Sequence, residues 1–283
     1  MNRQYPLRTA AALLTLLLNA CSTLPDADTR LHSAQTLAAA QGWQAHALRA
    51  GAFDLMAWAP AGRPGSSTLT VYVEGDGLAW LNSSTPSDDP TPTRPMLLRM
   101  AIAQPDGNAA YLARPCQYTR QRDPRCAAPY WTEKRFASEV VEAMSNGLDA
   151  LKRERQATTL ILVGYSGGGA ITALLAERRH DVTAWITVAG NIDTQAWTAY
   201  HHISPLLGSL DPMAASARLH DLAQWHFVGS RDRIVPPELV RGFASQMGNA
   251  QVIEREGYDH VCCWADDWAS AYWKLGLPDS VIP

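Results

Sequence analysis

A strand that runs directly into a glycine-rich turn and then a helix is the feature that most constrains the fold of this chain. Residues 159–163 form a near-continuous apolar run, the sequence GYSGG follows at residues 164–168, and a helix is predicted from about residue 168 to 179. Such a run is typical of a strand buried on both faces of a parallel sheet. Because parallel strands need long crossover connections that are usually helical, this unit predicts an α/β protein.

Further apolar runs repeat the alternation of strands and helices along the chain. The strands predicted from them lie near residues 53–58, 69–73, 109–113, 184–188, 225–228 and 251–253, and the helices lie near 96–103, 136–152 and 264–274. This order predicts a mostly parallel central sheet with helices on both faces. Ligands of such sheets bind at the carboxyl ends of the strands, so the residues of a functional site are expected there.

Length and composition indicate one large globular domain, which we place at residues 42–283. Hydrophobic residues make up 47% of the 283 residues and charged residues 18%, which is typical of a globular rather than a disordered chain. The net charge of −3 lacks the basic excess that binding to nucleic acid requires, so no nucleic-acid partner is expected.

The N-terminus has the pattern of an export signal. Arg3 and Arg8 supply positive charge, and the apolar run at residues 9–20 is short enough to favour a signal peptide over a membrane-spanning helix. The run ends in the sequence LNAC at residues 18–21, which resembles the bacterial lipobox.

That resemblance implies cleavage before Cys21 and attachment of lipid to its thiol, and Ser22 implies release from the inner membrane. We therefore expect a signal peptide at residues 1–20, a tether with a lead-in helix at residues 21–41, and an outer-membrane lipoprotein that faces the periplasm. Contact with the membrane is expected through the lipid anchor only. An ordinary signal peptide followed by an incidental cysteine is the alternative.

Four cysteines remain after the lipidation site, in a compartment that permits disulfides. Cys116 and Cys126 flank a short polar loop and are expected to form a disulfide. Cys262 and Cys263 are adjacent, and a vicinal disulfide, two free thiols and cross-pairing all remain open for them. No paired C-x-x-C or Cys/His spacing is present, so no metal site is expected.

Ser166 lies in the sequence G-x-S-x-G between a predicted strand and a predicted helix, which resembles the nucleophile turn of the α/β-hydrolase superfamily. Gly164 and Gly168 leave room for the backbone in such a tight turn, and the amide of Gly167 begins the helix, where it favours an oxyanion. A plain glycine turn is the alternative. The resemblance extends over residues 51–274. Within the superfamily, the chain more narrowly resembles proteobacterial α/β-hydrolase lipoproteins of undefined substrate.

The superfamily's chain order of serine, acid and histidine implies a base near the C-terminus, because a serine hydroxyl needs a base to become a nucleophile. His260 follows the last predicted strand and lies in a loop, where it is expected to reach back over the sheet. His226 lies inside an apolar strand and is expected to be a core histidine instead.

Asp232 follows the strand at residues 225–228 and resembles the acid of many α/β-hydrolases, which implies that it orients His260. A turn aspartate that binds its own backbone is the alternative. Asp193, after the preceding strand, is the second choice for the acid. Asp259 is a weaker choice, since adjacent side chains usually point apart.

The second oxyanion donor is expected in the loop after the strand at residues 69–73. Many relatives have His-Gly there, whereas this chain has Glu74 before Gly75. We expect the amide of Asp76 to donate, with Gly77 as the alternative, which requires the Asp76 carboxylate to point away or be paired.

The resemblance therefore implies an α/β-hydrolase fold with a small cap or none, and a serine hydrolase that cleaves a small-molecule ester without metal or cofactor. Residues 191–212 lie where relatives insert a cap, and they either line a substrate pocket or form a packed excursion. Two other functions stay open: a scaffold lipoprotein that keeps the fold without catalysis, and an acyltransferase that uses the same residues.

Overall fold

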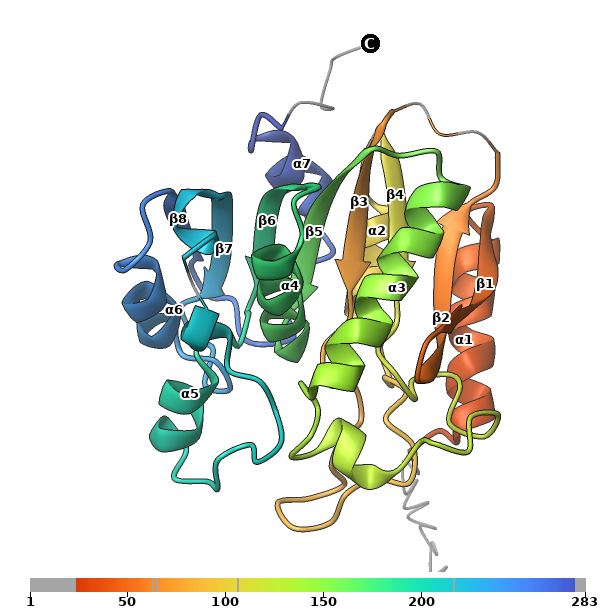
Figure 1. The fold of residues 1–283 in the computed structure, drawn as a ribbon, viewed down its shortest axis with the longest axis horizontal. Helices are drawn as coiled ribbons and strands as arrows, with labels where there is room; N and C mark the ends of the chain where they lie inside the picture. The colour runs from red at the N-terminus through yellow and green to blue at the C-terminus, as the bar shows by residue number, and fades with distance from the viewer. Residues whose placement is uncertain (1–23, 63, 65, 106, 216, 278–283) are drawn as a thin grey trace, which may run out of the picture.

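The computed structural model describes residues 24–277 apart from 63, 65, 106 and 216, and its centre is one eight-stranded sheet (Figure 1). The strands lie in the order β1-β2-β4-β3-β5-β6-β7-β8. Their bounds are β1 (Trp43–Ala50), β2 (Phe53–Pro60), β3 (Thr68–Val73), β4 (Asn108–Leu112), β5 (Thr159–Tyr165), β6 (Val182–Val188), β7 (Ala223–Gly229) and β8 (Ala250–Arg255). Pairs β1–β2 and β2–β4 are antiparallel, and all other pairs are parallel. The prediction of a mostly parallel sheet is confirmed.

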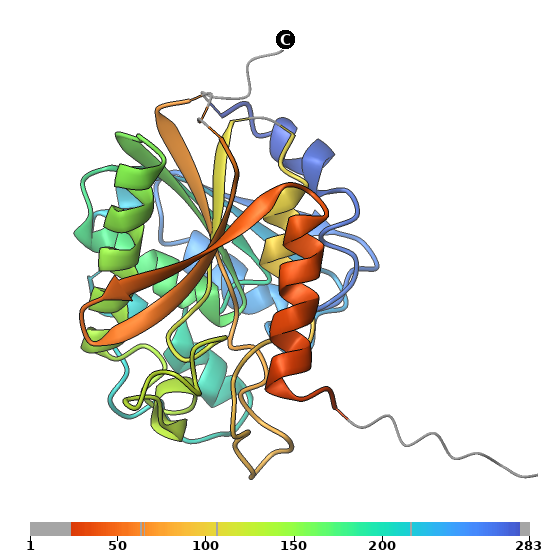
Figure 2. The same ribbon diagram turned by 90° about the vertical axis from the view of Figure 1, so that its right-hand side faces the viewer.

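Helices cover both faces of the sheet, as predicted (Figures 1 and 2). One apolar cluster joins the sheet to α3 (Ser138–Glu154), α4 (Gly167–Arg178) and α6 (Pro237–Ala244). A second cluster on the other face joins it to α1 (Ala27–Ala39), α2 (Met96–Ile102) and α7 (Trp268–Trp273). The short α5 (Thr194–Tyr200) lies beyond the carboxyl end of β6. Among the described residues, none of these helices is long and apolar enough to cross a membrane.

Three elements, the strand β1 and the short helices α5 and α6, were not predicted from the sequence because their patterns are weak. Strand β1 alternates exposed and partly buried side chains at the edge of the sheet, so it lacks a continuous apolar run. The eight residues of α6 were not expected as a helix. Helix α1, which lies before residue 42, packs on β1 and buries Arg30, which donates to the carbonyl oxygens of Asp89 and Thr91. The predicted signal peptide and Cys21 lie outside the described residues.

His226 on β7 is a core histidine, as predicted. Its ring is fully buried and bonds the Thr187 hydroxyl at 2.8 Å and the Gln224 side-chain oxygen at 2.9 Å. Burial lowers the pKa of His226 to about 3, so the ring is neutral at physiological pH. It therefore stabilises the β6–β7 pair and does not face the candidate site.

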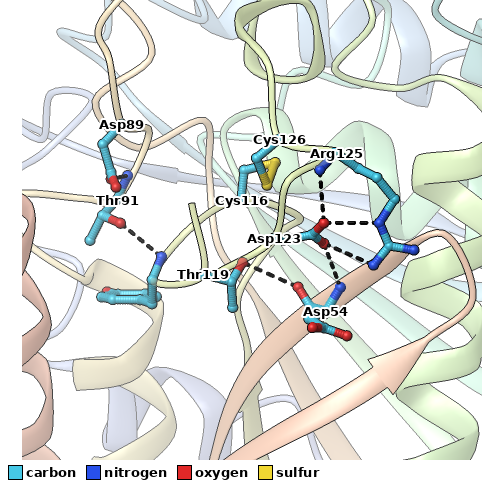
Figure 3. The surroundings of a disulfide bond; sticks show 9 residues. Asp54, Asp89, Thr91, Cys116, Thr119, Asp123, Arg125 and Cys126 are labelled. Carbon is cyan, nitrogen blue, oxygen red and sulfur yellow. Dashed lines mark hydrogen bonds and ion pairs between the residues drawn. A yellow bond between two sulfur atoms is a disulfide. The ribbon is translucent and has the colours of Figure 1, made fainter. Parts of the chain in front are cut away.

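The loop from Cys116 to Cys126 is closed by a disulfide, and the structure also joins Cys262 to Cys263 (Figure 3 shows the first). Within the first loop, Asp123 accepts the amide of Asp54 at 2.9 Å, which ties the loop to the start of β2. Gln117 next to the disulfide donates its side-chain amide to the Gly75 carbonyl oxygen at 2.8 Å. The disulfide loop thus braces the turn that follows β3.

Replacing Cys116 and Cys126 together by alanine is expected to lower the free energy of unfolding by about 2–3 kcal/mol, since the bridge closes a loop of sequence separation 10. Urea unfolding followed by circular dichroism measures the change. A matched double substitution of Ser83 and Ser84 by alanine, on an exposed loop, controls for general effects of substitution and is expected to change stability little. An unchanged unfolding midpoint in the cysteine variant would contradict the prediction.

Candidate active site

The parallel strands end at one edge of the sheet, and the three residues predicted as a catalytic set meet there. Ser166 follows β5, Asp232 follows β7, and His260 follows β8. The His260 Nε2 lies 2.9 Å from the Ser166 Oγ, and its Nδ1 lies 2.8 Å from the Asp232 Oδ2. These three side chains, which are far apart in the sequence, form one continuous hydrogen-bonded chain.

The turn that carries Ser166 is tight, and glycines make it possible. Ser166 has φ 51° and ψ −124°, a conformation that costs a non-glycine residue on the order of 1–3 kcal/mol. A Cβ on Gly164 would lie 2.4 Å from the Gly168 carbonyl oxygen, and one on Gly168 would lie 2.4 Å from the Val73 carbonyl oxygen. Strand β5 and helix α4 therefore hold the serine hydroxyl in a strained, fixed place above the sheet edge.

Asp232 is held on both sides by hydrogen bonds. Its Oδ1 accepts the amides of Ile234 and Val235, each at 2.8 Å, while its Oδ2 faces His260, and its side chain is fully buried. The two other aspartates bind elsewhere: Asp193 caps α5 by accepting the amide of Ala196, and Asp259 accepts the amides that follow His260. The structure thus brings only Asp232 of these three carboxylates to the imidazole.

The two hydrogen bonds of His260 favour one tautomer of its neutral imidazole. An ionised carboxylate can only accept, so Nδ1 of a neutral His260 carries the proton and donates to Asp232. The Nε2 atom is then free to accept the proton of the Ser166 hydroxyl. This arrangement can increase the nucleophilicity of a serine.

Asp76 lies in a buried ion cluster against Gly167, and its carboxylate is paired, as required. It binds the guanidinium groups of Arg114 and Arg135, whose side chains are 5% and 7% exposed. Burial alone would raise the pKa of Asp76, but Arg135 and Arg114 together hold it below its ordinary value. A Cβ on Gly167 would lie 2.0 Å from the Asp76 carboxylate, so only glycine fits between the cluster and α4.

Glu74, which stands where the resemblance implies a histidine, is buried at the end of β3 and has no direct ion pair among the described residues. Its carboxylate accepts the amides of Gly75 at 3.0 Å and Leu97 at 3.3 Å and the Tyr111 hydroxyl at 3.3 Å. Burial raises its pKa to about 7, although these three donors and the nearby Arg114 act in the opposite direction. Glu74 therefore ties the turn after β3 to the start of α2 and changes its charge near neutral pH.

This raised pKa predicts a loss of stability as pH rises. Between the ordinary value of 4.5 and about 7, the folded state keeps a proton on Glu74 that the unfolded state has lost. Across that range the free energy of unfolding falls by on the order of 3 kcal/mol from this group, at about 1.36 kcal/mol per pKa unit. Replacing Glu74 by glutamine is expected to remove that part of the pH dependence.

Urea unfolding of both proteins at a series of pH values across this range checks the prediction. The difference between wild type and Glu74→Gln isolates this carboxyl from the other titrating groups. Parallel curves for the two proteins would contradict it. Glu254→Gln on the exposed part of β8 serves as the control that should leave the wild-type slope unchanged.

A pocket of about 630 Å³ opens in front of Ser166. Its wall includes Trp197 of the segment 191–212. Of the two alternatives left open for that segment, a pocket lining and a packed excursion, the pocket lining therefore applies to Trp197. Arg135 and Tyr165 also line it, and the Tyr165 hydroxyl donates to the His260 carbonyl oxygen at 2.9 Å. Neither residue could be assigned a role from the sequence, because nothing in its local pattern shows which distant loop it meets.

The buried wall of the pocket also contains Asn191. Its side-chain oxygen is buried and has no hydrogen-bond partner among the described residues. A buried carbonyl oxygen without a donor is unfavourable in a folded protein. Its backbone amide donates to the Ser166 carbonyl oxygen at 2.9 Å, which fixes it beside the serine.

No protein-family model matches the chain, and no curated protein sequence matches it. Solved structures do match its fold. Est1E from Butyrivibrio proteoclasticus is 15% identical, with 82% of this chain and 97% of that chain covered and a TM-score of 0.57. An alpha-beta serine hydrolase homologue from Coxiella burnetii is 14% identical, with 82% and 95% covered and a TM-score of 0.56. The esterase domain of a Rhodothermus marinus protein is 15% identical, with 83% and 96% covered and a TM-score of 0.55. Together with the strand order, these likenesses show that the chain has the α/β-hydrolase fold.

Proposed function

We propose that this protein is a serine hydrolase that cleaves a small-molecule ester through an acyl-enzyme on Ser166. The observation that carries the proposal is the hydrogen-bonded chain from Asp232 through His260 to Ser166. His260 removes the proton of the serine hydroxyl as the oxygen attacks the carbonyl carbon, and Asp232 stabilises the imidazolium. The imidazolium then protonates the leaving alcohol, and water attacks the acyl-enzyme with His260 again as the base.

The oxyanion is proposed to bind between the amides of Gly167 and Asp76. Among the described residues, neither amide has a hydrogen-bond acceptor, and Gly167 begins α4, whose N-terminus favours negative charge. The turn after β3 lies against the serine, since a Cβ on Gly75 would lie 3.2 Å from the Ser166 Cβ. The Asp76 cluster contains two guanidinium groups and one carboxylate, so it carries a net positive charge. That charge would stabilise a negative charge on a substrate beside it.

A substrate with an apolar group suits the pocket best. Trp80, Trp197, Ile234 and Val261 supply apolar wall on several sides. An ester with an apolar acyl or alcohol part matches this lining.

Labelling with a fluorophosphonate probe tests the proposal. Wild type is expected to form an adduct on Ser166, identified by peptide mass spectrometry, and Ser166→Ala is expected to lose both labelling and hydrolysis of p-nitrophenyl esters. Heat-denatured wild type is the control for non-specific reaction. Equal ester hydrolysis by Ser166→Ala would refute the proposal.

Separate observations bear on the two alternatives. A scaffold without catalysis would be favoured by a Ser166–His260 distance too long for a hydrogen bond, and the 2.9 Å distance supports catalysis instead. Acyl transfer shares the acyl-enzyme with hydrolysis, so product analysis with an added alcohol acceptor separates the two.

We further propose that the mature protein is a lipoprotein anchored through Cys21 in the outer membrane and facing the periplasm. The lipobox-like sequence LNAC at residues 18–21 and the following Ser22 support this location. Incorporation of labelled palmitate into wild type but not into Cys21→Ser tests the anchor, and fractionation of the cell envelope tests the location. Absence of label from the wild type would refute the anchor.

A further inference from the structure

Large exposed apolar side chains gather at one edge of the molecule. Strands β3, β6, β7 and β8 are parallel, so the segments that follow them emerge at the same edge, which also holds Ser166. Trp80 and Leu81 follow β3, Tyr200, Ile203 and Leu207 follow β6, Ile234 follows β7, and Val261 follows β8. These side chains are 40–72% exposed, and we call this set the apolar rim.

The start of the described chain lies at the same edge. Leu24 is 57% exposed and shares a groove with Leu81, and the chain enters α1 from the edge to which the loop after β3 projects (Figures 1 and 2). Among the described residues, all large apolar side chains classed as exposed belong to the rim or to Leu24. The opposite edge of the sheet has none within that part of the chain. Such a one-sided distribution indicates an interaction surface.

Binding of a substrate in the pocket explains only part of the rim. Trp80, Ile234 and Val261 line the pocket, but Leu81 and Leu207 do not, and Leu207 is 72% exposed. Tyr200 and Ile203 also lie outside it. A second, larger partner is needed to cover them, and it must be apolar and broad enough to contact four separate loops.

The short distance along the chain from Cys21 to Leu24, the first described residue, identifies that partner. Cys21 is three residues before Leu24, and three residues span at most about 10 Å. A lipid on Cys21 therefore holds the bilayer surface next to Leu24 and Leu81. We propose that the apolar rim docks on the phospholipid bilayer, so that the pocket opens toward the membrane and takes ester substrates from it. The inference rests on the proposed anchor at Cys21 and replaces the expectation that the anchor alone contacts the membrane.

A polarity-sensitive dye on the rim tests the docking without depending on catalysis. Leu207→Cys is labelled in the full lipidated chain, since the four other cysteines of the described residues are paired. Vesicles of phosphatidylethanolamine and phosphatidylglycerol are expected to shift its emission to the blue. The same dye on Gln246→Cys, an exposed residue between α6 and β8 at the opposite edge, is expected not to respond.

Each outcome decides the proposal. A shift at residue 207 alone supports it, and equal responses at 207 and 246 overturn it. A shift that grows with protein concentration in the absence of vesicles overturns it in favour of a second copy of this chain. Failure of palmitate labelling at Cys21 refutes the anchor separately, and failure of fluorophosphonate labelling refutes the serine hydrolase, while the dye still reports on the rim.

Hydrolysis provides a second readout. Leu81→Glu combined with Leu207→Glu is expected to lose about tenfold or more in hydrolysis of a long-chain ester embedded in vesicles, because two apolar contacts are replaced by charges. Hydrolysis of water-soluble p-nitrophenyl acetate is expected to stay unchanged, which also shows that the variant is folded. Gln246→Glu adds one such charge at the opposite edge and should change neither activity. Full activity of the double variant on vesicles would overturn the proposal.

Discussion

Replacing Asp232 by asparagine is expected to lower kcat for ester hydrolysis by about a thousandfold to ten-thousandfold with little change in the fold. The amides of Ile234 and Val235 bind the Oδ1 side, so the amide oxygen of the new side chain occupies that place and its NH2 group faces His260. The imidazole must then accept at Nδ1 and carry its proton on Nε2. In that tautomer His260 cannot accept the proton of Ser166.

Steady-state kinetics with a p-nitrophenyl ester measures the loss, and circular dichroism verifies folding. The matched control is Asp259→Asn, because the Asp259 carboxylate is adjacent to His260 but accepts the amides of the two residues that follow it. It is expected to keep kcat within about threefold of wild type, as for other residues that do not contact the imidazole. A similar loss in both variants, or none in Asp232→Asn, would show that Asp232 does not orient the base.

Replacing Asp76 by alanine is expected to lower the free energy of unfolding by about 3–5 kcal/mol. The substitution leaves two almost fully buried guanidinium groups, Arg114 and Arg135, close together without their shared carboxylate. The pKa of Asp76 lies below its ordinary value of 3.8, so this stabilisation is present above that pH. It is lost as pH falls through the lower pKa of the folded state.

Urea unfolding at neutral pH measures this effect, and an exposed ion pair provides the comparison. Arg241 and Glu254 are paired with side chains 49% and 41% exposed, so Glu254→Gln should change stability by only about 0–1 kcal/mol. Equal effects of the two substitutions would contradict the role given to the buried cluster. Since the Asp76 amide is retained in the alanine variant, any remaining fluorophosphonate labelling reports on the backbone donor rather than on the carboxylate.

Local sequence patterns were sufficient to predict most of the sheet and the three residues that meet at its edge. A continuous apolar run has few alternatives to a buried parallel strand, and the carboxyl ends of parallel strands must share an edge. Ser166 and Asp232 each follow such a run and His260 follows the last predicted strand, so their convergence could be inferred before any distance was known. The edge strand β1 and the short α6 could not, because their residues are partly exposed and their apolar patterns are weak.

The sequence by itself determined the strand order along the chain, the tight turn at Ser166 and the order of the acid and the base. Only the tertiary structure decided which charges surround them. Arg114 and Arg135 lie in two different loops, and both bind Asp76. No local sequence pattern predicts these contacts. The apolar rim likewise arises from four loops that the parallel sheet brings to one edge. Pairing of distant side chains depends on how loops fold back on the sheet, and that depends on packing across the whole domain.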